Sequence, residues 1–382
     1  MSADHLDRPD RPYLSVIVPV HNGHATLPKS LEALAASDLP RWYWELIVVD
    51  DASTDDSSLI AARYADTVVR LPGKPHGPAY ARNRGFEVSR GENILFVDAD
   101  VCVHPDTLRR FVYVFYSEPE VSAVFGSYDD SPPAGGWISQ YRNLLHHWVH
   151  QQNPGEAETF WAGLGGIRRA AFVEAGMYDE WHFPRPQVED IELGHRIRAL
   201  GRRIVLRPEI QGTHLKHWTL GNVITTDMND RGVPWMRLLI QQGEAVRART
   251  LNLRTVEKIN TALVWLAVAF SATALVRRSE AWLWGVLLCV LLVLLFSSRL
   301  YGFFLRRRGL LFLLVAIPLH LMYYLLNGIS AGVGWLLHEL FGEPRPDPAV
   351  EAFAEVGVKM WPPVPSKRKL GAHHTPAART TE

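Results

Sequence analysis

An apolar run that ends in two acidic residues constrains the fold of this chain more than any other feature. Residues 93–100 read Asn-Ile-Leu-Phe-Val-Asp-Ala-Asp, so a strand-like stretch leads directly into Asp98 and Asp100. Because a buried strand excludes charge, we expect both carboxylates where the strand leaves the sheet. Such oxygen ligands suit Mg²⁺ or Mn²⁺, which can link a carboxylate to a diphosphate. The tripeptide is common in ordinary acidic turns, so its meaning depends on the rest of the chain.

Strand and helix patterns alternate around this run. We expect strands over residues 14–20, 45–49, 67–71, 93–97 and 121–127, and helices over residues 25–36, 55–64, 79–89 and 105–117. This alternation predicts an α/β fold with a mostly parallel, Rossmann-like sheet covered on both faces. Ligands of such sheets bind beyond the carboxyl ends of the strands. Asp50 and Asp51 end the second strand, so they are expected to meet Asp98 and Asp100 at one edge.

Charge and motif content exclude several classes of protein. Lys+Arg and Asp+Glu both number 40, so the strongly basic face of a nucleic-acid-binding protein is not expected. The first turn, residues 19–23, is not a G-x-G-x-x-G loop, and no G-x-x-x-x-G-K-[ST] occurs, which argues against a dinucleotide-binding dehydrogenase and a P-loop ATPase. Cys102 and Cys289 lie far apart in apolar settings, which favours a reducing compartment over a disulfide framework.

Long uncharged stretches set the C-terminal third of the chain apart. Residues 259–276, 281–298 and 309–337 contain no Asp, Glu, Lys or Arg, and each is near or above the ~18 residues that a spanning helix needs. We expect about three transmembrane helices within 256–341, with a buried helical core as the alternative. The first 13 residues have no apolar core, so no signal peptide is expected.

These patterns divide the chain into five parts. We expect a flexible N-terminus (1–13), an α/β domain (14–220), an interfacial helical linker (221–255), the transmembrane helices (256–341) and a disordered tail (342–382). Lys258 and the basic run 306–308 place the α/β domain in the cytosol by the positive-inside rule. Arg277 and Arg278 oppose that bias, and the side of the tail stays open.

Four segments together resemble the family 2 glycosyltransferases with the GT-A fold. They are residues 14–22, 48–55, 77–85 and 94–100, and their order and spacing match that family throughout residues 14–215. The resemblance implies an inverting transfer of a hexosyl-type sugar from a nucleoside diphosphate donor, with Mn²⁺ or Mg²⁺ as cofactor. It also implies roles for individual residues. Asp51 would hold the nucleobase, Asp98 the ribose or donor sugar, and Asp100 the metal.

The resemblance extends to further donor-site residues. Arg82 corresponds to a basic residue near the donor phosphates, although a solvated arginine on a helix face is the alternative. In the family, the glycine-rich segment 163–169 lines the donor-sugar and acceptor pocket, although a tight turn is equally consistent with it. The donor-binding positions expected on this basis, besides those above, are Pro19, Val20, Asn22, Gly165 and Gly166.

A second acidic pair opens a predicted helix. Glu189 and Asp190 precede an apolar stripe that ends near Gly201, and acidic residues at a helix start are explained by the helix dipole alone. The pair nevertheless resembles the family's E-D motif, whose Asp serves as general base. An inverting transfer needs one base to deprotonate the acceptor hydroxyl. We assign that role to Asp190, and to Glu189 the orientation of its surroundings.

Histidines follow in residues 210–218. His214 lies where several members of the family carry a histidine that completes the metal shell, and His217 is a weaker candidate. A structural histidine is the alternative, because a ligating histidine needs a fixed partner. Lys216 is a candidate for holding phosphate.

The resulting prediction is a multi-pass enzyme of the cell membrane with a cytosolic catalytic domain. It would move a sugar from a nucleoside-diphosphate sugar, with a UDP-sugar favoured because a carboxylate can accept the N3–H of uracil, to a lipid-linked or cell-envelope glycan acceptor. A processive polysaccharide synthase is one alternative, but no Q-x-x-R-W motif occurs. A nucleotidyltransferase is another alternative, but it would carry a glycine-rich basic loop in the first turn, which residues 19–23 lack. A non-catalytic membrane scaffold with a degenerate transferase domain is disfavoured, because the acidic positions are all present.

Overall fold

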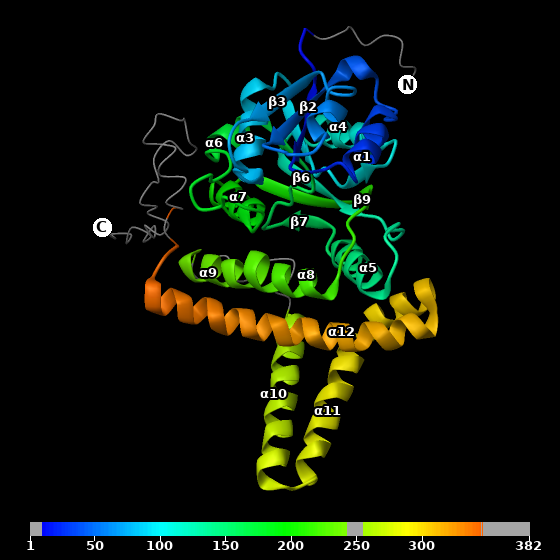
Figure 1. Cartoon of the computed structure of the whole chain (residues 1–382), viewed down its shortest axis with the longest axis vertical. Coiled ribbons are helices and arrows are strands. Elements are labelled where there is room, and N and C mark those ends of the chain that lie inside the picture. The colour runs from blue at the N-terminus through cyan, green and yellow to red at the C-terminus, as the bar shows by residue number, and fades with distance from the viewer. Residues whose placement is uncertain (1–9, 243–254, 345, 347–382) are drawn as a thin grey trace, which may run out of the picture.

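The computed structural model describes residues 10–242, 255–344 and 346 of the chain. An N-terminal α/β unit, here called the sheet domain (residues 14–214), sits above a group of C-terminal helices (Figure 1). Residues 1–9 of the predicted N-terminus, residues 243–254 of the predicted linker and nearly all of the predicted tail lie outside the described residues. The elements of the sheet domain are β1 (Leu14–Val20), α1 (Leu27–Ala35), η2 (Arg41–Tyr43), β2 (Trp44–Asp51), α2 (Ser57–Ala61), β3 (Thr67–Leu71), α3 (Pro78–Val88), β4 (Asn93–Val97), β5 (Val101–Val103), α4 (Thr107–Ser117), β6 (Val121–Tyr128), α5 (Trp137–Gln151), β7 (Gly155–Ala157), β8 (Leu164–Arg168), α6 (Arg169–Glu174), α7 (Glu189–Ala199) and β9 (Arg203–His214).

A nine-stranded sheet forms the centre of this domain. Its strand order is β3-β2-β1-β4-β8-β6-β9-β5, and β7 pairs with β9 off this path. Strands β1 to β4 are parallel to one another, whereas β8 is antiparallel to both β4 and β6. The α/β prediction is confirmed. Beyond β4 the sheet is mixed, so a mostly parallel sheet describes its first four strands only.

Burial on both faces explains the continuous apolar sequences of the first strands. Ile17 and Phe96 belong to a core that includes residues of α3, and Val18 and Leu95 belong to a second core that includes residues of α1 and α4. Side chains of a strand alternate between faces, so adjacent residues of β1 and β4 enter different cores. This leaves the carboxyl ends of the strands as the place where polar groups can accumulate.

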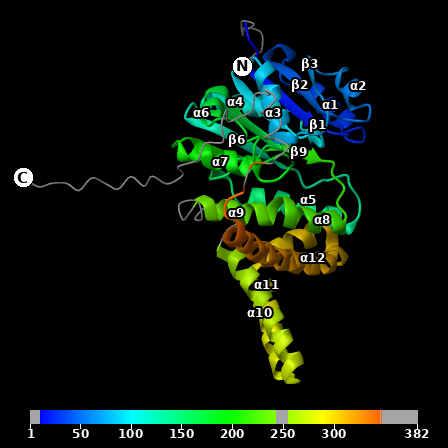
Figure 2. The ribbon, with the colours of Figure 1, turned by 60° about the vertical axis from the view of Figure 1, so that its left-hand side comes forward.

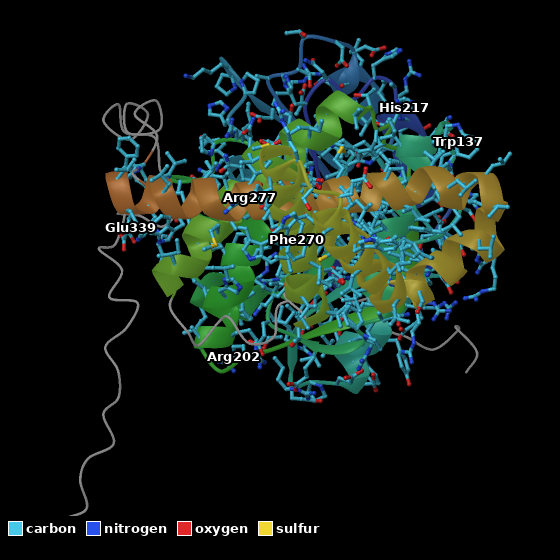
Figure 3. The ribbon with its side chains drawn as sticks, turned by 90° about the horizontal axis from the view of Figure 1, so that it is seen from below. Trp137, Arg202, His217, Phe270, Arg277 and Glu339 are labelled. Carbon is cyan, nitrogen blue, oxygen red and sulfur yellow. The ribbon has the colours of Figure 1, made fainter. Side chains whose placement is uncertain are left out.

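The C-terminal helices form a projecting hairpin and a platform. They are α8 (Leu220–Thr225), the π-helical η3 (Thr226–Gly232), α9 (Val233–Gln242), α10 (Thr255–Arg277), α11 (Ala281–Phe296) and α12 (Ser298–Phe341). In two views α10 and α11 run side by side away from the sheet domain, whereas α12 lies across the base of that domain (Figures 1 and 2). Seen from below, α12 crosses the width of the molecule (Figure 3).

Length and composition qualify two of these helices as candidate membrane spans. They are α10 and α12, while α11 is a shorter apolar helix. The third uncharged stretch of the sequence lies within α12, beyond a kink at Gly309, whose φ of 81° lies in the left-handed region that glycine tolerates. Because α12 lies across the hairpin, this arrangement does not favour three parallel spans.

Aromatic packing fixes α12 to the sheet domain. Phe303, Phe304 and Phe312 of α12 share a buried cluster with Tyr141 and Leu144 of α5. Phe304 is fully buried, and its ring centroid lies 5.9 Å from that of Tyr141 and 5.5 Å from that of Phe312. Helices α12 and α5, which are far apart in the sequence, therefore meet in an apolar interface.

We expect Phe304→Ala to lower the free energy of unfolding by about 3 kcal/mol, since it leaves a cavity in this interface. Leu305→Ala is the matched control, because Leu305 is 44% exposed and its loss should cost less than about 1 kcal/mol. Denaturant unfolding of the detergent-solubilised full chain measures both. Equal effects of the two variants would contradict the interface.

Candidate active site

A cleft of about 800 Å³ lies along the carboxyl ends of the strands and continues to α12. The predicted acidic positions from separate parts of the chain open onto it together. Its lining includes Asp51, Asp98, Asp100, Asp190 and His214. The edge predicted from strand order thus gathers the candidate catalytic and metal-binding residues into one space.

The link between β4 and β5 positions the Asp98 and Asp100 pair. Asp98 follows the last residue of β4, and its backbone N–H donates to the Gly163 carbonyl at 3.1 Å. Val101, the first residue of β5, is paired with His214 at the end of β9. This pairing brings His214 beside Asp100, although the two residues lie far apart in the sequence.

Asp100 and His214 have the chemistry of a metal-binding pair. The His214 Nε2 lies 3.4 Å from the Asp100 Oδ2, while its Nδ1 lies 2.7 Å from the Asn143 Oδ1. Since an amide oxygen only accepts, Nδ1 carries a proton. The Nε2 atom can carry a second proton and donate to Asp100, or lose that proton and offer a lone pair to a metal ion. The His214 ring also stacks on the Tyr128 ring, with the two ring centroids 4.1 Å apart. This fixed orientation is what a metal-ligating histidine requires.

The electrostatics of the pair fit a cation as well. Burial alone would raise the pKa of Asp100, but the hydrogen bond and charge of His214 and the charge of Lys216 outweigh it, so the pKa is lowered. The described residues contain no group of three or more His, Cys, Asp and Glu side chains that could hold a metal ion. A divalent ion held here would therefore take its remaining ligands from the diphosphate and water, which is usual for Mg²⁺.

Arg82 links two of the acidic residues. Its Nη2 donates to the Asp98 Oδ1 and its Nη1 to the Glu189 Oε1, each at 2.9 Å. Arg82 is 4% exposed, so the alternative of a solvated arginine is wrong. Burial raises the pKa of Asp98 despite the opposing charge of Arg82. In this structure Arg82 holds carboxylates in place, and its contact with donor phosphates stays a prediction.

Asp190 has the properties expected of a general base near neutral pH. It lies in the first turn of α7, where its Oδ2 accepts from the Ala162 N–H at 3.2 Å and its Oδ1 from the Ile191 N–H at 2.7 Å. Burial and the adjacent charge of Glu189 raise the pKa of Asp190 to about 7. A base with this pKa can take a proton at physiological pH.

Asp51 anchors the loop before α3. Its carboxylate accepts from the backbone N–H of His76 at 2.9 Å and of Gly77 at 2.7 Å. It also lines the cleft, so its position allows contact with a nucleobase, which stays a prediction. Pro19 and Val20 line the same end of the cleft.

Several other predicted residues do not belong to the cleft lining. Asn22 holds a turn, since its Oδ1 accepts from the Thr54 N–H at 2.8 Å. Gly165 and Gly166 lie inside β8, where a Cβ on Gly165 would come within 2.6 Å of the Phe160 ring. Gly165 and Gly166 therefore leave room for the aromatic rings that pack against β8. In the glycine-rich segment 163–169, Gly163 lines the cleft. In the histidine segment 210–218, Lys216 lines the cleft, whereas His217 is exposed and does not.

Helix α5 supplies site residues that the sequence did not indicate. Asn143 orients His214, and Arg142, His146 and His150 line the cleft. The helix could have been found from the spacing of Trp137, Tyr141, Leu144, Leu145 and Trp148. That spacing identifies a helix but does not show that its polar face meets the end of β9.

Comparison with known proteins agrees with this geometry. Residues 15–175 match the model of Glycosyl transferase family 2. The sheet domain is a family 2 glycosyltransferase domain, and it is called the transferase domain below. This transferase domain is 36% identical over 99 residues to the poly(ribitol-phosphate) beta-N-acetylglucosaminyltransferase TarS of Staphylococcus aureus, a match that covers 25% of this chain and 17% of the relative. It is 33% identical over 133 residues to the glycosyltransferase AglE of Haloferax volcanii, covering 34% of this chain and 43% of the relative. The chain thus spans less than half the length of either relative.

A solved structure confirms the GT-A type of fold. The mannosyltransferase PcManGT from Pyrobaculum calidifontis, solved with GDP-Man and Mn²⁺, superposes with a TM-score of 0.57. At 20% sequence identity the match covers 85% of this chain and 88% of that chain. The likeness therefore extends beyond the transferase domain into the C-terminal helices.

We expect Arg82→Gln to lower the free energy of unfolding by about 3 kcal/mol, because it leaves two carboxylates of the cleft without their shared cation. The matched control is Arg90→Gln, whose side chain is 67% exposed in its pair with Glu45 and should contribute less than about 1 kcal/mol. Denaturant unfolding at pH 7.5 compares the two. A cost for Arg82→Gln no larger than that for the control would show that the link does not stabilise the site.

Proposed function

We propose that this protein is a membrane-anchored, inverting glycosyltransferase that moves a sugar from a nucleoside-diphosphate sugar to a lipid-linked or cell-envelope glycan acceptor. The observation that carries the proposal is the single cleft shared by Asp51, Asp98, Asp100 and Asp190. Its strand end suits a nucleotide, and its other end is lined by Tyr323 and Asn327 of α12. A donor and an acceptor can therefore approach from opposite ends.

The residues divide the chemistry between them. Pro19, Val20 and Asp51 would hold the nucleoside, with a uracil base favoured because Asp51 offers a carboxylate acceptor. Asp190 removes the proton of the acceptor hydroxyl, whose oxygen attacks C1 of the sugar as the bond from C1 to the diphosphate breaks. Attack from the side opposite the leaving group inverts the configuration at C1.

Asp100 and His214 are the residues that would hold Mn²⁺ or Mg²⁺. Such an ion, when bound, offsets the charge that develops on the departing diphosphate. Arg82 keeps Glu189 and Asp98 in position on the two sides of the reacting centre. Glu189 in turn raises the pKa of Asp190, so it tunes the base without contacting the acceptor.

The C-terminal helices support attachment to a membrane. The hairpin α10–α11 is apolar, and α12 lies across it with exposed apolar side chains, among them Leu310, Leu311, Leu314, Trp335 and Leu336. We infer that the hairpin crosses the bilayer and that α12 lies at its surface. The transferase domain then faces the cytosol, since Lys258 lies near the start of α10 and Arg306 lies in α12, at the end of the hairpin nearer that domain, although Arg277 and Arg278 follow at the turn between α10 and α11 (Figure 1).

The direct test is transfer activity of the purified full chain. A panel of nucleoside-diphosphate sugars is incubated with the chain in detergent and lipid extract, with Mn²⁺ or with a chelator. We expect release of the nucleoside diphosphate from one donor, lost on chelation and on Asp100→Asn. Absence of release and of binding for every donor would overturn the proposed function.

The base assignment predicts a specific pH dependence. Because Asp190 acts only when deprotonated and its pKa lies at about 7, the rate should rise with pH through about 7 and level off above it. Asp190→Asn should lose at least about a hundredfold in turnover at every pH. Glu189→Gln should move the midpoint to lower pH, since a nearby negative charge is removed. Near-normal turnover of Asp190→Asn would exclude this base.

The orientation of the hairpin can be tested with single cysteines. With Cys102 and Cys289 replaced by Ala, Ser131→Cys places a thiol on the transferase domain and Glu280→Cys places one at the turn of the hairpin; both positions are exposed. In sealed cells an impermeant maleimide should label Glu280→Cys, and Ser131→Cys should react only after lysis. Labelling of both from one side would show that the hairpin does not cross the membrane.

A further inference from the structure

Arg231 is a cation that lines the cleft. It belongs to η3, the π-helical segment between α8 and α9. Within the described part of the chain, its guanidinium makes no hydrogen bond or ion pair. Single π-helical turns often occur at functional sites. A half-buried guanidinium with free donors is well suited to bind an anion bidentately.

The two carboxylates whose charges act on Arg231, those of Asp227 and Asp190, do not form an ion pair with it. Arg142 takes up the nearby carboxylate of Asp227 in a close ion pair. Lys216 also faces this space, with its Nζ 4.2 Å from the centre of the Trp218 ring. Burial, followed by the charge of Arg142, lowers the pKa of Arg231. An anion placed between Arg231 and Lys216 would relieve this unfavourable charge.

Arg231 lies on the acceptor side of the cleft. Asp190, the candidate base, is among the groups whose charge acts on it. The nucleoside end of the cleft is instead built from the strand ends at Pro19, Val20 and Asp51. Inversion requires the acceptor to approach opposite the leaving diphosphate, so an anion at Arg231 belongs to the acceptor.

The same end of the cleft is continuous with the membrane-side helices. Trp235 of α9 and Tyr323 and Asn327 of α12 line it. The segment η3 rests directly on α12, since a Cβ on Gly232 would lie 2.5 Å from the Ser330 side chain. A group bound at Arg231 is therefore next to the helix that we place at the bilayer surface.

We propose that Arg231, assisted by Lys216, forms a subsite for the phosphate group of a lipid-linked acceptor. The lipid chain would leave the cleft past Trp235 and Tyr323 along α12. This inference rests on the proposed function and names the class of its acceptor, a sugar carried on a lipid phosphate or diphosphate, whose hydroxyl then reaches Asp190. The binding step involves no covalent change.

Binding of a short prenyl phosphate tests the subsite. The full chain in detergent is titrated with farnesyl phosphate, with farnesol and with inorganic phosphate, followed by the fluorescence of the nearby tryptophans. We expect farnesyl phosphate to bind at least about tenfold more tightly than either of the others. Arg231→Gln should weaken its binding by roughly tenfold to a hundredfold, the loss of a charge-assisted hydrogen-bonding pair, and Arg231→Lys should weaken it less.

Matched variants show whether binding of the probe depends on the cations of the cleft. Arg237→Gln is the control, because Arg237 lies on α9 and donates to the Gly342 carbonyl outside the cleft; it should bind the probe as the unmutated chain does. Lys216→Gln is a second variant that should weaken binding if Arg231→Gln fails to fold. Equal affinity for farnesol, or unchanged affinity in both Arg231→Gln and Lys216→Gln, would overturn the phosphate subsite.

Nucleotide binding distinguishes this inference from the proposed function. UDP and GDP are titrated with Mn²⁺ into the unmutated chain and into Arg231→Gln. If Arg231→Gln weakens nucleotide binding as much as prenyl phosphate binding, the residue belongs to the donor site and the subsite is wrong. If the unmutated chain binds no nucleotide at all, the transferase function fails independently of the result with farnesyl phosphate.

Discussion

The link from Arg82 to Asp98 and Glu189 is the interaction on which the site depends. Parallel strands and the start of α7 bring several carboxylates to one edge of the sheet, and their mutual repulsion must be offset. Arg82 is buried between two of them and contacts both at 2.9 Å. Burial and the charge of Glu189 raise the pKa of Asp190 although Arg82 opposes them, whereas His214 and Lys216 lower the pKa of Asp100 against the effect of burial. Neighbouring acids of one cleft thus differ in protonation behaviour because different charged groups lie beside each of them.

The platform helix α12 gives this cleft its second boundary. Packing of Phe304 against α5 fixes α12 beneath the sheet domain, while Tyr323 and Asn327 on the same helix reach the cleft. The element that lines the end of the cleft away from the strands is therefore also the element that meets the hairpin. This continuity connects the cleft directly to the apolar hairpin.

Much of the transferase domain was predictable from the sequence because the signals are local. The apolar runs 67–71 and 93–97 are the strands β3 and β4, and Asp98 and Asp100 lie where exclusion of charge from a sheet places them. The start of α7 at Glu189 followed from an acidic first turn before an apolar stripe. Asn143 and Arg142 were not predictable, because α5 resembles an ordinary amphipathic helix until it packs against β9. Arg231 was not predictable either, because only the packing of η3 with α9 and α12 brings it to the cleft.

The sequence by itself determined the strands, the acidic strand ends and the presence of long apolar helices, since periodicity and hydropathy depend only on neighbouring residues. The tertiary structure decided which charges meet and which apolar helices point away from the domain. Residues 309–337 are as long and as apolar as a spanning helix, yet contacts with α5, η3 and α9 lay them across the hairpin. Contacts between distant segments made that choice, because the length and hydropathy of a helix do not specify which other elements it packs against.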